Sequence, residues 1–169
     1  MRILGIDPGT ASTGWGIVDQ DKKAENGLKM VGYGVITTKA KTPNSERLLI
    51  INNELEKIVK KYSPDISSVE KLFFTNNQKT AMSVGEARGV ILLVLEKNDI
   101  PIYGFTPLEI KNGVCGYGRA DKKQVQTMVQ AILQMDKLPK PDDAADGLAA
   151  AICGAGSVQR DDIIRTSNE

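Results

Sequence analysis

Residues 2–19 read RILGIDPGTASTGWGIVD, which is two runs of apolar and β-branched residues joined by the turn-prone segment DPGTAS. Runs of this kind, punctuated by glycine and bounded by turn residues, predict strands from Arg2 to Asp7 and from Thr13 to Asp19. A third run, Met30 to Thr38 (MVGYGVITT), continues the pattern. Because consecutive short strands usually pair with their neighbours, the chain is expected to open with a three-stranded meander.

Beyond the meander, helical and strand patterns alternate. Apolar residues at helical spacing, among them Leu48, Ile51 and Leu55, predict a helix from Asn44 to Tyr62 that Ser63 and Pro64 end. The elements expected after it are a strand Ile66 to Leu72, a helix Asn77 to Glu96, a strand Pro101 to Phe105, and helices Pro107 to about Val114, Asp121 to Gln134 and Asp142 to Ala155, with a glycine-rich loop at Gly113 to Gly118. This order predicts an α/β domain with a mixed five-stranded sheet and helices on both faces.

The 169 residues fit one compact domain, expected over residues 1–156, followed by a polar tail over residues 157–169. Cys115 and Cys153 are the two cysteines and histidine is absent, so a disulfide framework and a Cys/His zinc site are excluded. The sequence has no signal-peptide pattern and no apolar run long enough to cross a bilayer. The protein is therefore expected to be soluble, cytoplasmic and independent of membranes.

Two acidic residues lie in predicted strands, where a buried position would normally be apolar. Asp7 ends the first strand, and Glu70 follows Val69 in the fourth. Burial of such a carboxylate without a partner would cost several kcal/mol, so each acid needs a cation. A neighbouring lysine in an ordinary salt bridge is one candidate cation, and a bound metal ion is another.

Two further acids, Asp143 and Asp146, are three residues apart at the start of the last predicted helix and therefore project from one face. Their repulsion is offset in part by the helix dipole. Asp143 alone could be an ordinary helix-start acid, and Asp142 is expected to cap the helix. The small residues around them, among them Ala144 and Gly147, would let the helix approach the sheet closely enough for these acids to meet Asp7.

Carboxylate oxygens without histidine or cysteine select Mg²⁺ or Mn²⁺, and four of them suit two ions per site. Two ions held together favour in-line phosphodiester hydrolysis. The formal net charge of +1 is modest for a nucleic-acid-binding protein. Neutralising the four acids on metal would leave a positive excess that can line a binding face.

Five motifs resemble the RuvC family of Holliday junction resolvases in the same order along the chain. They are GIDPGT at Gly5 to Thr10, TGWG at Thr13 to Gly16, VEKLFFTNN at Val69 to Asn77, GEARGV at Gly85 to Val90 and DAADGLAAAI at Asp143 to Ile152. The resemblance implies a ribonuclease H-like fold. It also implies that Asp7, Glu70, Asp143 and Asp146 are the metal-binding catalytic acids of a Mg²⁺-dependent endonuclease.

The family cuts four-way DNA junctions as a homodimer, with paired symmetric nicks, and works beside the branch-migration proteins RuvA and RuvB. By resemblance, Phe73 would stack on a base near the junction centre, and DNA would be contacted by Lys111 and Lys122, with Arg119 and Lys123 beside the latter. Without the resemblance these cations would be ordinary solvated residues. The apolar face of the predicted helix Asn77 to Glu96 is either the dimer interface or simply packed on its own sheet.

Three other functions fit parts of the sequence. A sugar-kinase or actin-like ATPase also carries an Asp-x-Gly-Thr turn that holds phosphates, but such enzymes need two related domains and 169 residues are too few. A nuclease of the same fold that trims RNA is a nearer alternative. The third is a module that binds branched DNA without cutting it, which the presence of all four acids disfavours.

Overall fold

The computed structural model describes residues 1–72 and 78–157. Its strands and helices in chain order are β1 (Arg2–Asp7), β2 (Ser12–Gln20), β3 (Leu28–Thr37), α1 (Asn44–Tyr62), β4 (Ile66–Glu70), α2 (Gln78–Lys97), β5 (Ile102–Phe105), α3 (Pro107–Cys115), α4 (Lys122–Ile132) and α5 (Asp142–Ser157). All ten elements follow the predicted order, with bounds within about two residues of those read from the hydrophobic patterns. Among the described residues, no helix has the length and apolar character needed to span a membrane.

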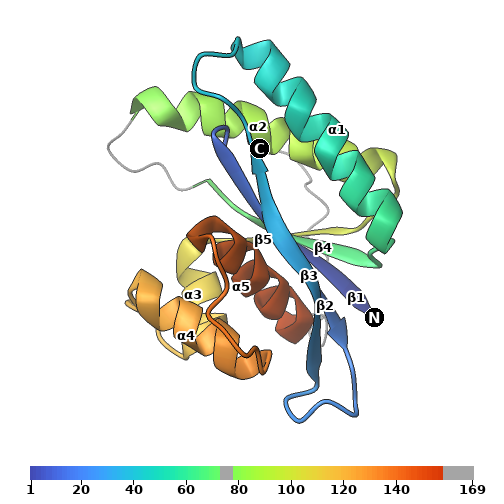
Figure 1. Ribbon diagram of the computed structural model, residues 1–169, viewed down its shortest axis with the longest axis vertical. Helices are drawn as coiled ribbons and strands as arrows, with labels where there is room; N and C mark the ends of the chain where they lie inside the picture. Colours follow the sequence, from blue (N-terminus) through green and yellow to red (C-terminus); the bar gives the residue numbers. More distant parts are fainter. Residues whose placement is uncertain (73–77, 158–169) are drawn as a thin grey trace.

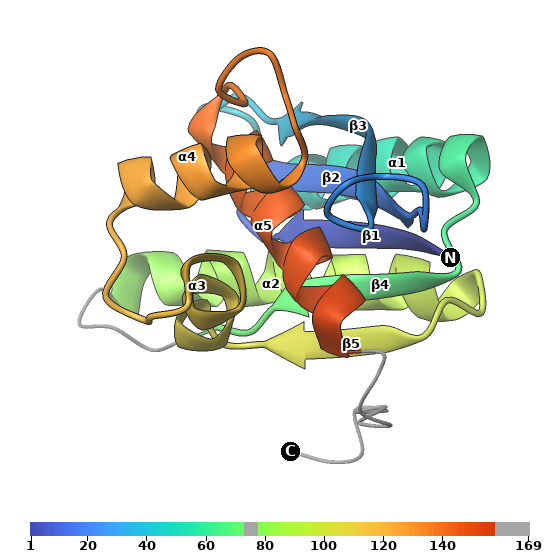
Figure 2. The same ribbon diagram turned by 90° about the horizontal axis from the view of Figure 1, so that it is seen from below.

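The five strands form one mixed sheet in the order β3-β2-β1-β4-β5. The meander β1-β2-β3 is antiparallel, whereas β4 and β5 run parallel to β1. Helices α1 and α2 cover one face of the sheet, and α3, α4 and α5 cover the other (Figures 1 and 2). The predicted α/β architecture with helices on both faces is thus confirmed, and β1 is its central strand.

Large aliphatic side chains fill the space between the sheet and the α1–α2 layer. Leu4 and Ile6 point from β1 toward Ile51 of α1 and Ile91 of α2, and all four are fully buried. Helix α1 ends where predicted, because Ser63 adopts a left-handed conformation with φ of 45°. This face is a conventional aliphatic core.

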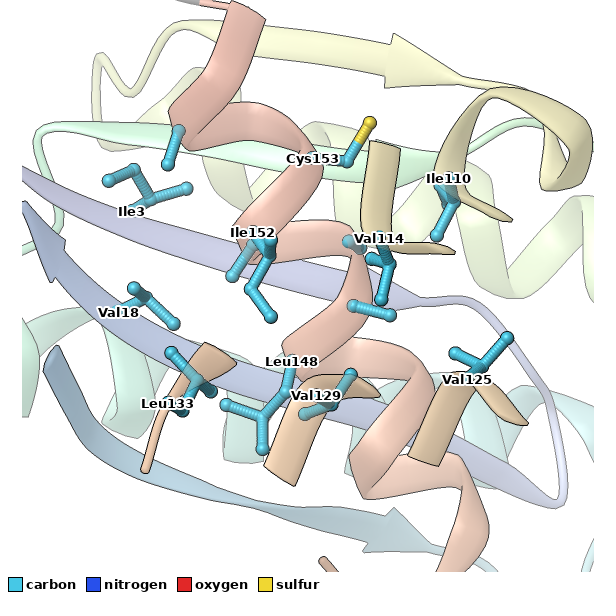
Figure 3. Packing of buried hydrophobic residues seen from close by; sticks show 14 of the residues in the cluster. Ile3, Val18, Ile110, Val114, Val125, Val129, Leu133, Leu148, Ile152 and Cys153 are labelled. Carbon is cyan, nitrogen blue, oxygen red and sulfur yellow. The ribbon is translucent and has the colours of Figure 1, made fainter. Parts of the chain in front are cut away.

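The opposite face is covered mainly by α5, which lies directly on β1 and β2. A Cβ atom added at Gly16 would lie 2.7 Å from the Leu148 Cα, and one added at Gly147 would lie 2.6 Å from backbone atoms of Trp15. Close approach of the two backbones therefore requires glycine at these positions. Around this contact, apolar residues of α3 and α4, such as Val114 and Val129, complete a second core (Figure 3).

Helix α3 departs from the sequence expectation at its C-terminal end. The glycine-rich loop predicted for residues 113–118 begins later, because α3 continues through Gly113 to Cys115 and ends at Gly116 with φ of 78°. Within the helix, Gly113 lies against α5: a Cβ there would lie 3.1 Å from the Cys153 Sγ. At the other end of the chain, α5 extends to Ser157, and the rest of the predicted tail lies outside the described residues.

The apolar face predicted for α2 packs mainly on its own sheet. Ile91 and Leu95 are fully buried in the core beneath the helix, so these two residues cannot also form a dimer interface. The exposed apolar residues of α2 are instead Met82 and Leu93, with exposed fractions of 76% and 56%. A surface made by these residues would lie on the solvent side of the helix.

Candidate metal centre

Asp7 and Glu70 are the last residues of β1 and β4, which are adjacent and parallel. The register pairs Ile6 with Val69, so the two acids follow at equivalent positions on neighbouring strands. Side chains alternate along a strand. Because Ile6 faces the α1–α2 core, Asp7 projects toward the opposite layer, as Glu70 does after the buried Val69. The sheet therefore presents two carboxylates together at one edge of the α5 face.

Helix α5 brings two more acids to the same place. Carboxylate oxygens of Asp7, Asp143 and Asp146 lie within 4.8 Å of one another, and all three side chains are partly buried. The close approach depends on Gly14, which pairs with Asp7 in the sheet and lies against the backbone carbonyl of Asp143. A side chain at position 14 would push away the first turn of α5, and with it both acids.

The negative charges of these acids repel one another, and burial adds to the cost of ionising them. Burial, followed by the charges of Glu70, Asp146 and Asp143, raises the pKa of Asp7 to about 8. Burial and Asp146 raise the pKa of Glu70 to about 7, and burial also raises the pKa of Asp146. Deprotonated carboxylates packed this closely require a cation, so the donor set fits hard divalent ions such as Mg²⁺ or Mn²⁺.

Two lysines face the acids across a hollow of about 240 Å³, which is also lined by Asp7, Glu70 and Asp146. Lys122, the first residue of α4, places its Nζ 3.4 Å from Asp146 Oδ2. Burial alone would lower the pKa of Lys122, but the carboxylates around it reverse the effect and raise it. Lys111 of α3 lies nearer Glu70, whose pKa it lowers against the larger effect of burial.

Comparison with known proteins identifies the family. A family model described as crossover junction endodeoxyribonuclease RuvC matches residues 3–154. The chain belongs to the RuvC family. It is 52% identical to the RuvC of Ruminiclostridium cellulolyticum over 157 residues, covering 93% of each chain. It is 49% identical to that of Fusobacterium nucleatum over 158 residues, covering 94% of this chain and 82% of the relative.

A solved structure has the same fold over nearly the whole chain. Thermus thermophilus RuvC in complex with a Holliday junction substrate superimposes with a TM-score of 0.86 at 30% identity, covering 94% of this chain and 95% of that one. The superposition confirms the ribonuclease H-like fold that the motifs implied. The four acids singled out from the sequence therefore lie together in a fold typical of RuvC proteins.

The residues expected to contact DNA divide into three groups. Lys111 and Lys122 line the hollow beside the acids. Arg119 and Lys123 flank the start of α4 and are exposed, and neither forms an ion pair within the described part of the chain. Phe73 lies outside the described residues, so its predicted stacking role stays a prediction.

Sequence reasoning missed two residues that bond acids at the start of α5, one of them an acid of this RuvC-family site. The Ser12 hydroxyl donates a hydrogen bond to Asp143 Oδ2, and Gln126 donates one of 2.8 Å to Asp142 Oδ1. Asp142 is therefore not the expected cap: α5 begins at this residue, and its carboxylate is turned toward α4. The available signal for Ser12 was its place two residues before Gly14, on the same face of β2.

Proposed function

We propose that this protein is a Mg²⁺-dependent endonuclease that resolves four-way DNA junctions by paired nicks. The observation that carries the proposal is the convergence of Asp7, Asp143 and Asp146, with Glu70 beside them, on one edge of the sheet. Support for the junction as substrate comes from family membership and from the likeness to the T. thermophilus RuvC that was solved with a Holliday junction.

The four acids would hold two divalent ions, with Mn²⁺ able to replace Mg²⁺. Such ions supply Lewis acidity to the scissile phosphate and help generate the attacking hydroxide. The protein's own contribution is to fix the acids before substrate arrives: Asp7 and Glu70 are set by the strands, and Asp143 is held by Ser12. Lys111 and Lys122 would bind phosphate oxygens at the rim, with Arg119, Lys123 and Phe73 extending the DNA contact.

Symmetric nicking needs two active sites, so we also propose a homodimer. Exposed apolar residues on the α1–α2 layer support it: Leu49 and Ile50 on α1, and Met82 and Leu93 on α2. Leu93 lies one turn before Lys97, which borders the same surface hollow as Ile50. By family resemblance, RuvA and RuvB would be the functional partners.

The decisive assay is incubation with a synthetic four-way junction, with and without Mg²⁺, followed by mapping of nicks on every arm. Paired nicks on strands of like polarity are expected only with Mg²⁺.

Asp7→Asn should lower cleavage by about a thousandfold or more, the scale on which loss of charge stabilisation in the transition state acts, while junction binding is retained. Asp136→Asn, which changes an exposed acid, is the matched control. Equal cleavage of an RNA duplex would favour the RNA-trimming alternative.

The dimer is tested separately by sedimentation velocity. Leu93→Glu should shift the parent dimer toward monomer, because a charge would be buried at the interface. Met128→Glu, on the exposed side of α4 across the sheet, should leave the oligomeric state unchanged. A parent protein that sediments as a monomer at micromolar concentration would contradict the homodimer.

A further inference from the structure

The ammonium of Lys122 lies against three carboxylates at the start of α5. Its Nζ is 3.4 Å from Asp146 Oδ2, 3.7 Å from Asp142 Oδ2 and 4.0 Å from Asp143 Oδ1. Two of these acids, Asp143 and Asp146, are the same ones whose oxygens cluster with Asp7. Lys122 thus forms ion pairs with two of the acids that we assign to the metal.

The backbone of Lys122 is held in place by the capped first turn of α4. Asp121 caps α4 through reciprocal hydrogen bonds with Gln124, and Val125, one turn after the cap, is buried against α5. The side chain of Lys122 is nevertheless 51% exposed. Its base is anchored, whereas its amine has solvent into which it can move.

We propose that the Lys122 ammonium and a divalent cation compete for Asp143 and Asp146, so that metal loading releases this lysine for a DNA phosphate. The inference rests on the proposed metal-dependent function. Two positive charges a few ångströms apart repel strongly in a partly buried site, so the ammonium and a divalent ion oppose each other at the same carboxylates. When metal binds, the Lys122 ammonium would therefore become free to bind a DNA phosphate at the rim of the same site.

The neighbouring lysines make the assignment specific. Lys123 follows directly on α4 and is exposed, and no ion pair to the acids is found for it within the described residues. Lys111 lies on the other side of the hollow, where it acts on Glu70 rather than on the acids of α5. Lys122 alone is expected to respond to occupation of Asp143 and Asp146.

The first test measures Mn²⁺ binding to the full chain without DNA, using the electron paramagnetic resonance signal of the free ion as the readout. Lys122→Met should bind Mn²⁺ about tenfold more tightly than the parent, or about 1.4 kcal/mol. Lys123→Met, which removes the same charge one residue away, and Lys122→Arg, which keeps the charge, should both stay close to the parent. Equal affinity of Lys122→Met and the parent would overturn the competition.

The second test follows the lysine itself. Reductive methylation with ¹³C-formaldehyde keeps the charge on each lysine and gives an NMR signal, and the Lys122 signal is assigned by its absence in Lys122→Met. Titration with Mg²⁺ should shift the Lys122 signal and leave that of Lys123 in place. A Lys122 signal that stays fixed while Mg²⁺ binds would rule out release of the lysine.

The two proposals fail in distinguishable ways. If the parent binds Mn²⁺ no better than its Asp7→Asn variant, the acids do not form a metal site, and the proposed function fails together with the competition. If Asp7→Asn does weaken Mn²⁺ binding but Lys122→Met changes nothing, the metal site stands and only the role of Lys122 is wrong.

Discussion

On the α1–α2 face of the sheet, the helices are held off the strands by large aliphatic side chains such as Leu4, Ile6 and Ile91. On the other face, the backbone of α5 lies against glycines of β1 and β2. A layer of flexible side chains can absorb small shifts, whereas a backbone contact cannot. The acids are carried by the face with the backbone contact, so positioning of the acids depends on the α5 face, whereas the α1–α2 face contributes a conventional aliphatic core.

The largest effect is expected from a substitution at Gly14, where α5 lies against β2. A Cβ at this position would overlap the Asp143 carbonyl, so Gly14→Ala must displace α5. We expect a loss of about 4 kcal/mol or more in the free energy of unfolding, measured by urea denaturation. Mn²⁺ affinity of any folded fraction should fall as well, because Asp143 moves. A variant as stable as the parent would show that α5 is not in rigid contact with the sheet.

A cavity on the opposite face should affect stability but not chemistry. Ile91 is fully buried in the α1–α2 core, and Ile91→Ala should lower the free energy of unfolding by about 3 kcal/mol. Junction cleavage per folded molecule should remain that of the parent at 25 °C, because the acids lie on the other face. Loss of cleavage in a variant that is still folded would contradict the separation of the two faces.

Only the α5 face should respond to metal and pH together. The pKa of Asp7 is raised to about 8 and that of Glu70 to about 7. The folded protein therefore binds more protons than the unfolded chain between about pH 4 and pH 8, and its free energy of unfolding falls as pH rises through this range. The proposed Mg²⁺ would bind the deprotonated acids, so its stabilisation of the fold is expected to grow over the same pH range. Saturating Mg²⁺ should raise Tm by about 5 °C at pH 8.5 and by about 1 °C at pH 6.

The control for this titration is Asp7→Asn, in which the Mg²⁺-dependent rise in Tm at pH 8.5 should be greatly reduced. Scanning calorimetry of both proteins at the two pH values checks the prediction. A Mg²⁺ effect that is the same at pH 6 and pH 8.5 would show that the acids are already charged at the lower pH.

The smallest expected difference concerns helix ends. On the site face, α3 and α4 both begin with capping boxes, whereas α1 on the other face has Pro43 as its N-cap residue and no side-chain cap. Thr106→Ala removes the cap of α3 and should lower the free energy of unfolding by about 1 kcal/mol. Thr42→Ala, next to the uncapped start of α1, is the control and should change stability less.

Much of this architecture was predictable because it depends on local periodicity. The alternation in the first strand identified Asp7 as an acid at a strand end, and the spacing of Asp143 and Asp146 placed both on one helix face. The small residues of α5 correctly indicated close packing on the sheet. Each of these signals is contained within a few consecutive residues.

What sequence reasoning missed depends on contacts between segments that are distant along the chain. The ion pairs of Lys122 with the acids of α5 follow from how α4 packs beside that helix. The contact of Gly113 on α3 with Cys153 on α5 is likewise not revealed by any local pattern. Asp142 turns toward Gln126 of α4 instead of capping its own helix. In each case the contact joins residues of different elements, which the local sequence pattern does not specify.

Strands β1 and β4 are neighbours in the sheet and pair in parallel. The separation between Asp7 and Glu70 is set by main-chain hydrogen bonds of two neighbouring strands, with Ile6 opposite Val69. This spacing does not depend on which apolar side chains fill the two hydrophobic layers. Exchanges among the apolar residues of the hydrophobic layers are therefore expected to leave the separation of the two acids unchanged.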